Sequence, residues 1–174
     1  VALVGCGRIS KNHFNAINRE KSLKLVAICD INIQRLNYHK KKYSIPGFES
    51  FETMLEECKS IEAVILCTPS GIHASQAILA SSYKKHVITE KPMATYLKDG
   101  LKMVDSCKKN RVKLFVIKQN RYNETLLNLK KAVDDKRFGN LIFVQVNVFW
   151  NRNQSYYDAD EWKGTRKLDG GALM

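Results

Sequence analysis

Two short groups of residues, far apart in the chain, have the types and spacing that could carry chemistry. The first is the turn Gly5-Cys6-Gly7-Arg8-Ile9-Ser10, which follows an apolar run and precedes a helical pattern. In that context Gly5 would permit a tight turn, and Gly7 would let the backbone approach a pyrophosphate. The small Ser10 would let helix and strand pack closely. The turn therefore predicts a dinucleotide site, against the alternative of an ordinary strand–helix connection.

A carboxylate supports the same site. Asp30 ends the second apolar run, about 20 residues beyond the glycine turn, where an acidic residue accepts hydrogen bonds from the adenosine ribose hydroxyls. The carboxylate would repel a 2′-phosphate, and Ile31 and Asn32 follow it without an adjacent Arg. This pattern favours NAD over NADP. The alternative role for Asp30 is to cap the helix that begins near Ile33.

The second group is Glu90-Lys91-Pro92, which follows another short apolar run. A lysine ammonium near C4 of a nicotinamide could orient a substrate hydroxyl and stabilise its developing alkoxide character. An isolated Lys-Pro usually belongs to a surface turn, but the glycine turn and Asp30 favour a catalytic Lys91. Thr68-Pro69-Ser70 follows a third run, and we expect it near the nicotinamide ribose. His73 could reach the cofactor or be a local cap or packing group.

These groups all follow apolar runs, so the elements that position them should form a parallel sheet. Strands are expected at 1–4, 23–29, 63–67, 87–89 and 112–117, and helices at 9–19, 33–42, 51–58, 72–82 and 97–109, with a turn at 45–47. Such alternation predicts an α/β fold in which helices cover both faces of a parallel sheet. We therefore predict a Rossmann dinucleotide-binding domain over residues 1–117, with ligands at the carboxyl ends of its strands.

The pattern changes after residue 117. A helix is expected at 124–134, and strict alternation at 141–150 predicts a long strand of a different, mostly antiparallel sheet. Residues 151–167 are polar and aromatic without a period, which indicates a loop. Residues 118–174 are therefore predicted to begin an α+β catalytic domain. Because the chain starts inside a strand and stops after Gly170-Gly171 without a closing element, we expect it to be a fragment.

Composition disfavours several function classes. The net charge of +12 invites a nucleic-acid interpretation, but the lysines are scattered along helical patterns, so we predict no nucleic-acid partner. A positive field could still concentrate an anionic substrate such as a nucleotide sugar. The 5 cysteines lack C-x-x-C spacing, which favours reduced thiols in a cytoplasmic protein over a metal site. No apolar run approaches the roughly 20 residues that span a bilayer, so no membrane association is expected.

Together the motifs resemble a known family. The turn at 5–10, Thr68-Pro69-Ser70-Gly71-Ile72-His73 and Glu90-Lys91-Pro92-Met93-Ala94 are similar to the Gfo/Idh/MocA oxidoreductases, which include glucose–fructose oxidoreductase and inositol dehydrogenase. The glycine turn is common to many folds, whereas the Glu-Lys-Pro tripeptide is much more specific. Residues 115–123, 147–152 and 156–171 are further similar to the dehydrogenases that oxidise the sugar 3-hydroxyl of UDP-N-acetylglucosaminuronic acid in bacterial surface-polysaccharide precursor synthesis.

The resemblance implies a role for each candidate residue. It places NAD against Gly5, Gly7, Arg8, Ile9, Asp30, Thr68, Ser70, His73, Glu90, Lys91 and Gln119. It makes Lys91 catalytic, and it places a UDP-sugar uronate against Lys91, Asn120, Arg121, Tyr156, Trp162, Lys163 and Thr165, with no metal. The family's other catalytic residue is a histidine a few positions beyond a glycine pair like Gly170-Gly171. The chain ends before that point, so it is expected to be inactive alone.

The resemblance also implies partners and leaves rivals open. It suggests that bound cofactor is reoxidised by a small 2-oxo acid, and that the full-length protein is a homo-oligomer joined through its C-terminal sheet. One rival is a dehydrogenase of inositol or another sugar in the same family. The other, from a different class, is a non-catalytic NAD-sensing regulator on the same fold, which the presence of Lys91 disfavours.

Overall fold

The computed structural model describes residues 1–170 of the 174-residue chain. The described chain forms two units. One comprises residues 1–117 with the segment from Trp162 onward, and the other comprises residues 118–161. The predicted Gly170-Gly171 pair lies partly outside the described residues. The assignment of residues 118–174 to a catalytic domain stays a prediction.

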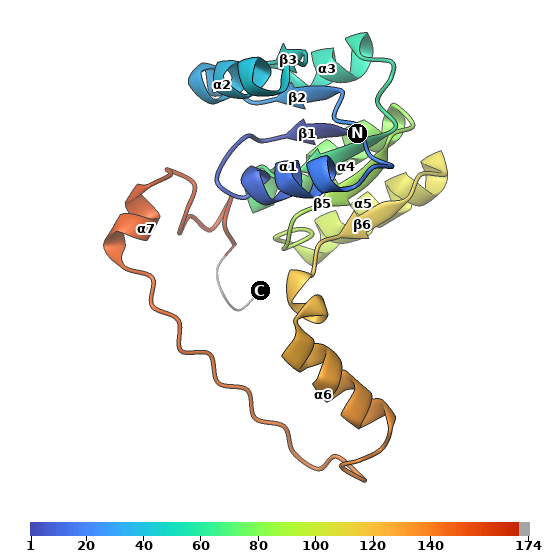
Figure 1. The fold of residues 1–174 in the computed structure, drawn as a ribbon, viewed down its shortest axis with the longest axis vertical. Helices are drawn as coiled ribbons and strands as arrows, with labels where there is room; N and C mark the ends of the chain where they lie inside the picture. Colours follow the sequence, from blue (N-terminus) through green and yellow to red (C-terminus); the bar gives the residue numbers. More distant parts are fainter. Residues whose placement is uncertain (171–174) are drawn as a thin grey trace. The chain divides into compact units, whose positions relative to one another are not determined.

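The first unit is built on a six-stranded parallel sheet (Figure 1). Its strands are β1 (Ala2–Val4), β2 (Ala27–Cys29), β3 (Gly47–Phe48), β4 (Ala63–Leu66), β5 (His86–Thr89) and β6 (Leu114–Val116). They lie in the order β3-β2-β1-β4-β5-β6, and every pair is parallel. This order reverses direction between β1 and β4, the point where doubly wound sheets bind dinucleotides. The predicted α/β Rossmann fold is confirmed.

Helices cover both faces of this sheet, as the unbroken apolar strands require. They are α1 (Ser10–Arg19), α2 (Ile33–Tyr43), α3 (Phe51–Glu57), α4 (His73–Ser82), which follows the short 3₁₀ turn η1 (Ser70–Ile72), and α5 (Leu97–Asn110). Successive strand residues join two different cores. Leu3 packs with Phe14 of α1 and Leu36 of α2, whereas its neighbours Ala2 and Val4 belong to the core of α3, α4 and α5.

Three predicted boundaries in the first unit are wrong in detail. The strand expected at 23–29 begins only at Ala27, and the one expected at 112–117 is limited to Leu114–Val116. The turn expected at 45–47 instead leads into β3, whose Gly47 and Phe48 pair with Ile28 and Cys29. A two-residue edge strand carries no hydrophobic period, so the sequence pattern had no signal for it.

The second unit contains η2 (Gln119–Tyr122), α6 (Glu124–Asp134) and α7 (Gln154–Asp158). The predicted helix at 124–134 is confirmed, whereas residues 141–150, predicted to be a strand, form no strand in the structure. A strand is stabilised by a partner, and no segment within residues 1–170 pairs with this one. The loop predicted at 151–167 contains α7, which begins because the Asn153 side chain accepts the Tyr156 N–H.

Candidate functional site

The glycine turn joins three neighbouring strands at their carboxyl ends. The Gly5 N–H donates to the Cys29 carbonyl at 2.8 Å, and Gly5 has a φ of +90°. A Cβ on Gly5 would lie 2.8 Å from the Cys67 carbonyl carbon, so only glycine fits here. α1 starts at the buried Ser10, whose Oγ donates to the Gly7 carbonyl at 2.6 Å. A Cβ on Gly7 would meet no atom nearer than 3.8 Å, which leaves open space beside the turn.

The Asp30 carboxylate links this turn to the start of α2. Its Oδ2 accepts the Cys6 N–H at 2.5 Å, and its Oδ1 accepts the Asn32 N–H at 2.7 Å. The side chain of Asn32, not Asp30, caps α2 by accepting the Arg35 N–H, so the alternative role predicted for Asp30 is wrong. Burial, followed by the charge of Asp30, raises the pKa of Cys6 to about 12. The thiol therefore stays neutral beside the Asp30 carboxylate.

Arg35 is a residue that the sequence interpretation missed. One of its guanidinium nitrogens lies 3.8 Å from the position that a Cβ on Gly7 would occupy, so a cation does lie near the turn. The sequence could have indicated it, because Arg35 is the third residue of the helix capped by Asn32. Side chains in a first helical turn point back toward the helix N-terminus, which for α2 is the Asp30 end.

The Glu90 carboxylate, directly after β5, is held by two groups. His13 Nε2 on α1 lies 2.7 Å from Glu90 Oε1, and Oε2 accepts the Lys91 N–H at 3.2 Å. Burial raises the pKa of Glu90, but the hydrogen bond and charge of His13 and the contacts of Lys91 lower it, with a net pKa below the usual range. The carboxylate thus stays charged and fixes the backbone of Lys91, whose own side chain is exposed. The Lys91–Pro92 peptide bond is cis.

His73 ties together the loops that follow β4 and β5. The residue is 1% exposed, with Nε2 2.8 Å from the Thr68 carbonyl and Nδ1 2.9 Å from the Pro92 carbonyl. Both partners are acceptors, so each contact is a hydrogen bond only when the facing nitrogen carries a proton. The Thr68 hydroxyl is itself directed to the side chain of Gln76 at 2.5 Å. Both nitrogens of His73 thus face protein carbonyls, which is the packing alternative that the sequence left open.

Residues 162–170 lie against η1. The Gly71 N–H donates to the Leu168 carbonyl at 2.8 Å, which places the predicted substrate residues Trp162, Lys163 and Thr165 in the first unit. The Thr165 hydroxyl donates to the Trp162 carbonyl at 2.7 Å and accepts the Leu168 N–H at 3.3 Å. Thr165 therefore shapes this segment through its hydroxyl.

Four predicted residues belong to the second unit. Gln119, Asn120 and Arg121 form part of η2 and are exposed. Tyr156 lies on α7, where the Arg152 guanidinium is 4.6 Å from its ring centroid and 3.7 Å from that of Trp150. The first three residues thus share one 3₁₀ turn, and Tyr156 takes part in a cation–π stack with Arg152.

The other predicted residues meet at one edge of the sheet. The glycine turn follows β1, Asp30 follows β2, Thr68 and Ser70 follow β4, and Glu90 with Lys91 follows β5. Arg8 and Ile9 complete the turn with exposed side chains, and Ser70 is buried in η1. Because β1, β2, β4 and β5 are parallel neighbours, their carboxyl ends share one edge. This arrangement can hold a dinucleotide across the point where the strand order reverses.

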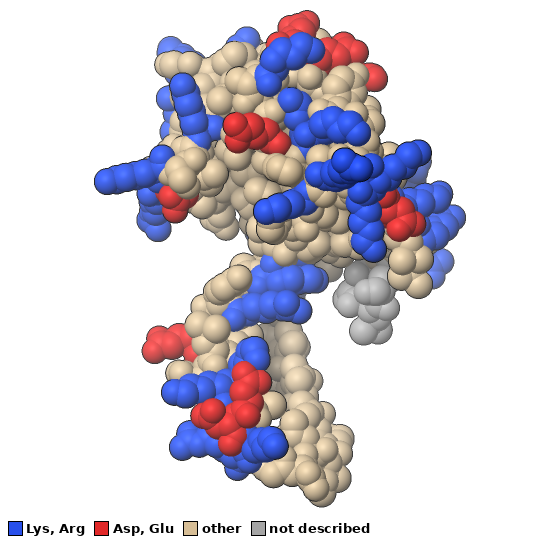
Figure 2. Space-filling model, turned by 90° about the vertical axis from the view of Figure 1, so that its right-hand side faces the viewer, with Lys and Arg blue, Asp and Glu red and all other residues tan. Residues whose placement is uncertain are grey.

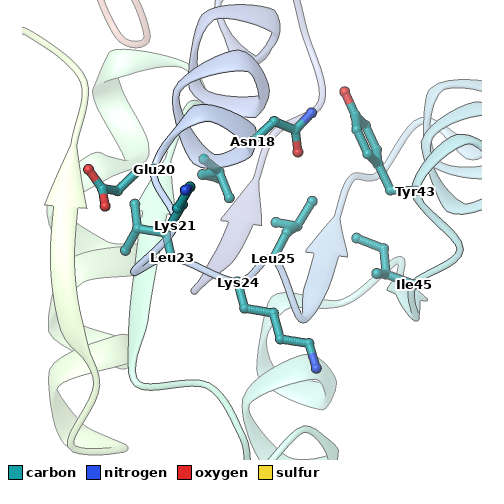
Figure 3. Close-up of a pocket in the computed structure, with 9 residues that line it drawn as sticks. Asn18, Glu20, Lys21, Leu23, Lys24, Leu25, Tyr43 and Ile45 are labelled. Atoms are coloured by element: carbon teal, nitrogen blue, oxygen red, sulfur yellow. The ribbon is translucent and has the colours of Figure 1, made fainter.

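A separate hollow of about 320 Å³ lies at the other end of β2 (Figure 3). Its lining includes Leu23 and Leu25, which precede β2, together with Tyr43 at the end of α2 and Ile45 after it. It is therefore distinct from the predicted crevice. On the face drawn in Figure 2, lysines and arginines are spread over the surface and interrupted by acidic residues. Across residues 1–170, no His, Cys, Asp and Glu cluster is placed to hold a metal ion. No helix in that range is long and apolar enough to cross a membrane.

Comparison with known proteins agrees with this geometry. The Gfo/Idh/MocA family, described as an oxidoreductase family with an NAD-binding Rossmann fold, matches residues 1–118. Among curated proteins, the chain is 29% identical over 147 residues to glucose-6-phosphate 3-dehydrogenase of Bacillus subtilis, covering 84% of this chain and 41% of that protein. It is 30% identical over 139 residues to myo-inositol 2-dehydrogenase of Thermotoga maritima, covering 80% of this chain and 42% of that protein.

Two solved structures resemble nearly the whole chain. They are the WlbA dehydrogenases of Chromobacterium violaceum and Bordetella pertussis, each in complex with NADH and UDP-GlcNAcA. Each is 48% identical with a TM-score of 0.96, covering 99% of this chain and 50% or 53% of the other. The chain thus spans about half the length of the proteins it matches.

Proposed function

Because the chain belongs to the Gfo/Idh/MocA family of NAD-binding oxidoreductases, we propose that the protein oxidises the 3-hydroxyl of a nucleotide-sugar uronate with NAD. The substrate would be of the UDP-N-acetylglucosaminuronic acid type, in the synthesis of surface-polysaccharide precursors. The observation that carries the proposal is the 48% identity, over 99% of this chain, to two WlbA dehydrogenases whose complexes hold NADH and UDP-GlcNAcA.

The residues at the sheet edge fit an NAD molecule. The open space beside Gly7 leaves room for a pyrophosphate, and the start of α1 offers backbone N–H groups to it, with Arg8 and Ile9 in the same turn. Asp30 is held beside the turn by two N–H groups, and its carboxylate retains lone pairs for the ribose hydroxyls. Bound NAD supplies the hydride acceptor.

We propose NAD rather than NADP because Asp30 faces the turn. A carboxylate next to a 2′-phosphate would repel it, whereas it accepts hydrogen bonds from a free 2′-hydroxyl. Arg35 adds a cation near Gly7 and is the group that could offset this repulsion. The preference for NAD over NADP therefore depends on two charges. That of Asp30 disfavours a 2′-phosphate, and that of Arg35 favours it.

We propose that Lys91 is a catalytic residue. When the C3–H bond of the sugar breaks, its hydride leaves and the hydroxyl proton goes to a base, so that a C=O bond forms at C3. Lys91 would orient the hydroxyl and stabilise the developing alkoxide, while Glu90 and His13 fix its backbone. Thr68, Ser70, His73 and Gln119 would border the nicotinamide. The base is proposed to be a histidine beyond the glycine pair, so residues 1–174 alone should not turn over.

We propose that the nucleotide sugar is bound by residues of both units. Asn120, Arg121, Tyr156, Trp162, Lys163 and Thr165 would contact the UDP-sugar. We propose that residues 141–150, where Ile142 and Phe149 are each 96% exposed, become a strand of an antiparallel sheet when partner strands are present. We further propose that the whole protein forms a homo-oligomer joined through that sheet. A 2-oxo acid would accept the hydride from NADH, and the protein would be cytoplasmic.

A substrate panel with the whole protein tests this function. NADH formation is followed with UDP-N-acetylglucosaminuronic acid, myo-inositol and glucose 6-phosphate as separate substrates. The proposal predicts that the nucleotide sugar alone supports rapid reduction of NAD. Faster reduction with myo-inositol would favour the rival dehydrogenase, which the 30% identity to myo-inositol 2-dehydrogenase supports. NAD binding without reduction by any of the three would favour the sensor.

A further inference from the structure

The backbone conformation of Gly71 does not by itself require glycine. Its φ lies outside the left-handed region, so an L-residue could adopt the same conformation in η1. A Cβ at this position, however, would lie 2.1 Å from the Lys167 carbonyl oxygen and 2.8 Å from the Leu168 Cα. The obstacle is backbone of a segment almost one hundred residues further along the chain.

That segment is a compact turn with its own hydrogen bonds. Thr165 accepts the N–H groups of Asp169 and Gly170 through its carbonyl, at 2.9 and 3.2 Å. The Asp169 carboxylate closes the turn by accepting the Gly164 N–H at 2.7 Å. Gly164 and Gly170 have φ values of +73° and +85°, which suit glycine. The turn is thus preformed and presents the Leu168 carbonyl to the Gly71 N–H.

We propose that Gly71 is the docking point for residues 162–170, and that this contact couples the substrate-binding segment to the loop beside the nicotinamide. The inference rests on the proposed function, because Trp162 and Lys163 are assigned to the nucleotide sugar there. Gly71 acts as a positioning residue. It sits between Ser70 and His73 in the loop after β4, so the same loop that borders the cofactor also holds the segment.

The proposal distinguishes two kinds of binding. Most of the proposed NAD contacts, at the glycine turn and Asp30, follow β1 and β2, whereas residues 162–170 contact η1 after β4. The nucleotide sugar needs the docked segment. Gly71→Ala should therefore leave the dissociation constant of NAD within about twofold and weaken binding of UDP-N-acetylglucosaminuronic acid about tenfold. That factor corresponds to ~1.4 kcal/mol, the order of one lost backbone hydrogen bond.

The experiment uses the whole protein and three variants. Gly71→Ala blocks docking, and Asp169→Ala opens the turn without touching η1. The control is Glu57→Ala, which changes an exposed side chain on α3. NAD and nucleotide-sugar affinities are measured by calorimetry. Limited trypsin digestion then reports docking independently of activity, because Lys163, Arg166 and Lys167 are cleavage sites within the segment.

The expected result is that Gly71→Ala and Asp169→Ala both speed cleavage in 162–170 about tenfold or more and weaken only the nucleotide sugar. Unchanged cleavage in Gly71→Ala would overturn the docking contact. Faster cleavage with unchanged nucleotide-sugar affinity would overturn its role in substrate binding. If the wild type binds NAD but no nucleotide sugar, the proposed function fails, and the digestion still decides the docking contact.

Discussion

The two sides of the candidate site are held by different kinds of contact. On the turn side, comprising residues 5–10 and Asp30, the contacts join adjacent strand ends through backbone groups, as when the Asp30 carboxylate accepts the Cys6 N–H. On the lysine side, comprising the loops at 68–73 and 90–94 and the segment 162–170, some contacts join helices and loops that do not follow adjacent strands. His13 meets Glu90 across 77 residues, and His73 meets the Pro92 carbonyl.

This difference separates two tasks. The turn side depends on backbone shape, because a dinucleotide is bound by N–H groups and one carboxylate. The lysine side has the proposed task of placing one ammonium, and its hydrogen bonds fix the loops around Lys91. Variants on the turn side should therefore change cofactor affinity, whereas loss of the Lys91 ammonium on the lysine side should change turnover.

The largest expected effect is on the lysine side. Lys91→Met should lower kcat in the whole protein by about 10²–10⁴-fold, because the group that polarises the hydroxyl is lost. Stability and NAD affinity should be unchanged, since the Lys91 side chain is exposed. Steady-state kinetics, thermal unfolding and NAD titration on one preparation measure all three. A variant that binds NAD poorly but turns over normally would place Lys91 on the turn side.

The next largest effect is expected on the stability of the turn side, where Gly5 has a left-handed backbone conformation. Gly5→Ala should destabilise the fold by about 2–4 kcal/mol, because φ is +90° and the new Cβ would meet the backbone of Cys67 and Thr68. Gly7→Ala is the matched control, since its Cβ enters open space. It should keep the free energy of unfolding within about 0.5 kcal/mol and still weaken NAD. Denaturant unfolding and NAD titration compare the two, and equal stability in both variants would contradict the structure.

Asp30 should control which dinucleotide binds. Asp30→Ser should weaken NAD about tenfold and reduce the discrimination against NADP, because a ribose acceptor and a repulsive charge are both lost. The ratio of the two dissociation constants, measured on one sample, removes any effect of partial unfolding. Arg35→Gln is the companion variant and should shift this ratio toward NAD. Tighter binding of NADP than NAD by the wild type would refute the proposed preference.

The smallest effect is a pH dependence on the lysine side. The pKa of Glu90 is lowered in the folded protein, so its charged form adds stability above the ordinary value of 4.5, and this stability is lost as pH falls through the lower folded pKa. Glu90→Gln should cost about 1–2 kcal/mol near neutral pH and progressively less below pH 4.5. The exposed Glu57→Gln is the control and should show no such trend in denaturant unfolding. A cost for Glu90→Gln that is independent of pH would contradict the His13 contact.

The same contrast explains what could be predicted from the sequence. Gly5, Gly7 and Asp30 follow strands at a spacing that the local chain geometry dictates, so their common edge was predictable. His13, Arg35 and Gly71 were missed, because their contacts depend on where helices and remote segments pack. Residues 141–150 form no strand for a related reason, since alternation sets which face each residue would occupy but provides no partner strand.

The fate of the hydrogen on C3 of the sugar tests the proposed function most directly. The whole protein is given NAD and UDP-N-acetylglucosaminuronic acid deuterated at C3, and the reduced cofactor and nucleotide-sugar product are analysed by mass spectrometry. The proposed function predicts deuterium in NADH and a 3-keto product that has lost it. Unlabelled NADH, or deuterium retained in an oxidised sugar, would show that the hydride comes from another carbon and would contradict the proposed 3-dehydrogenase.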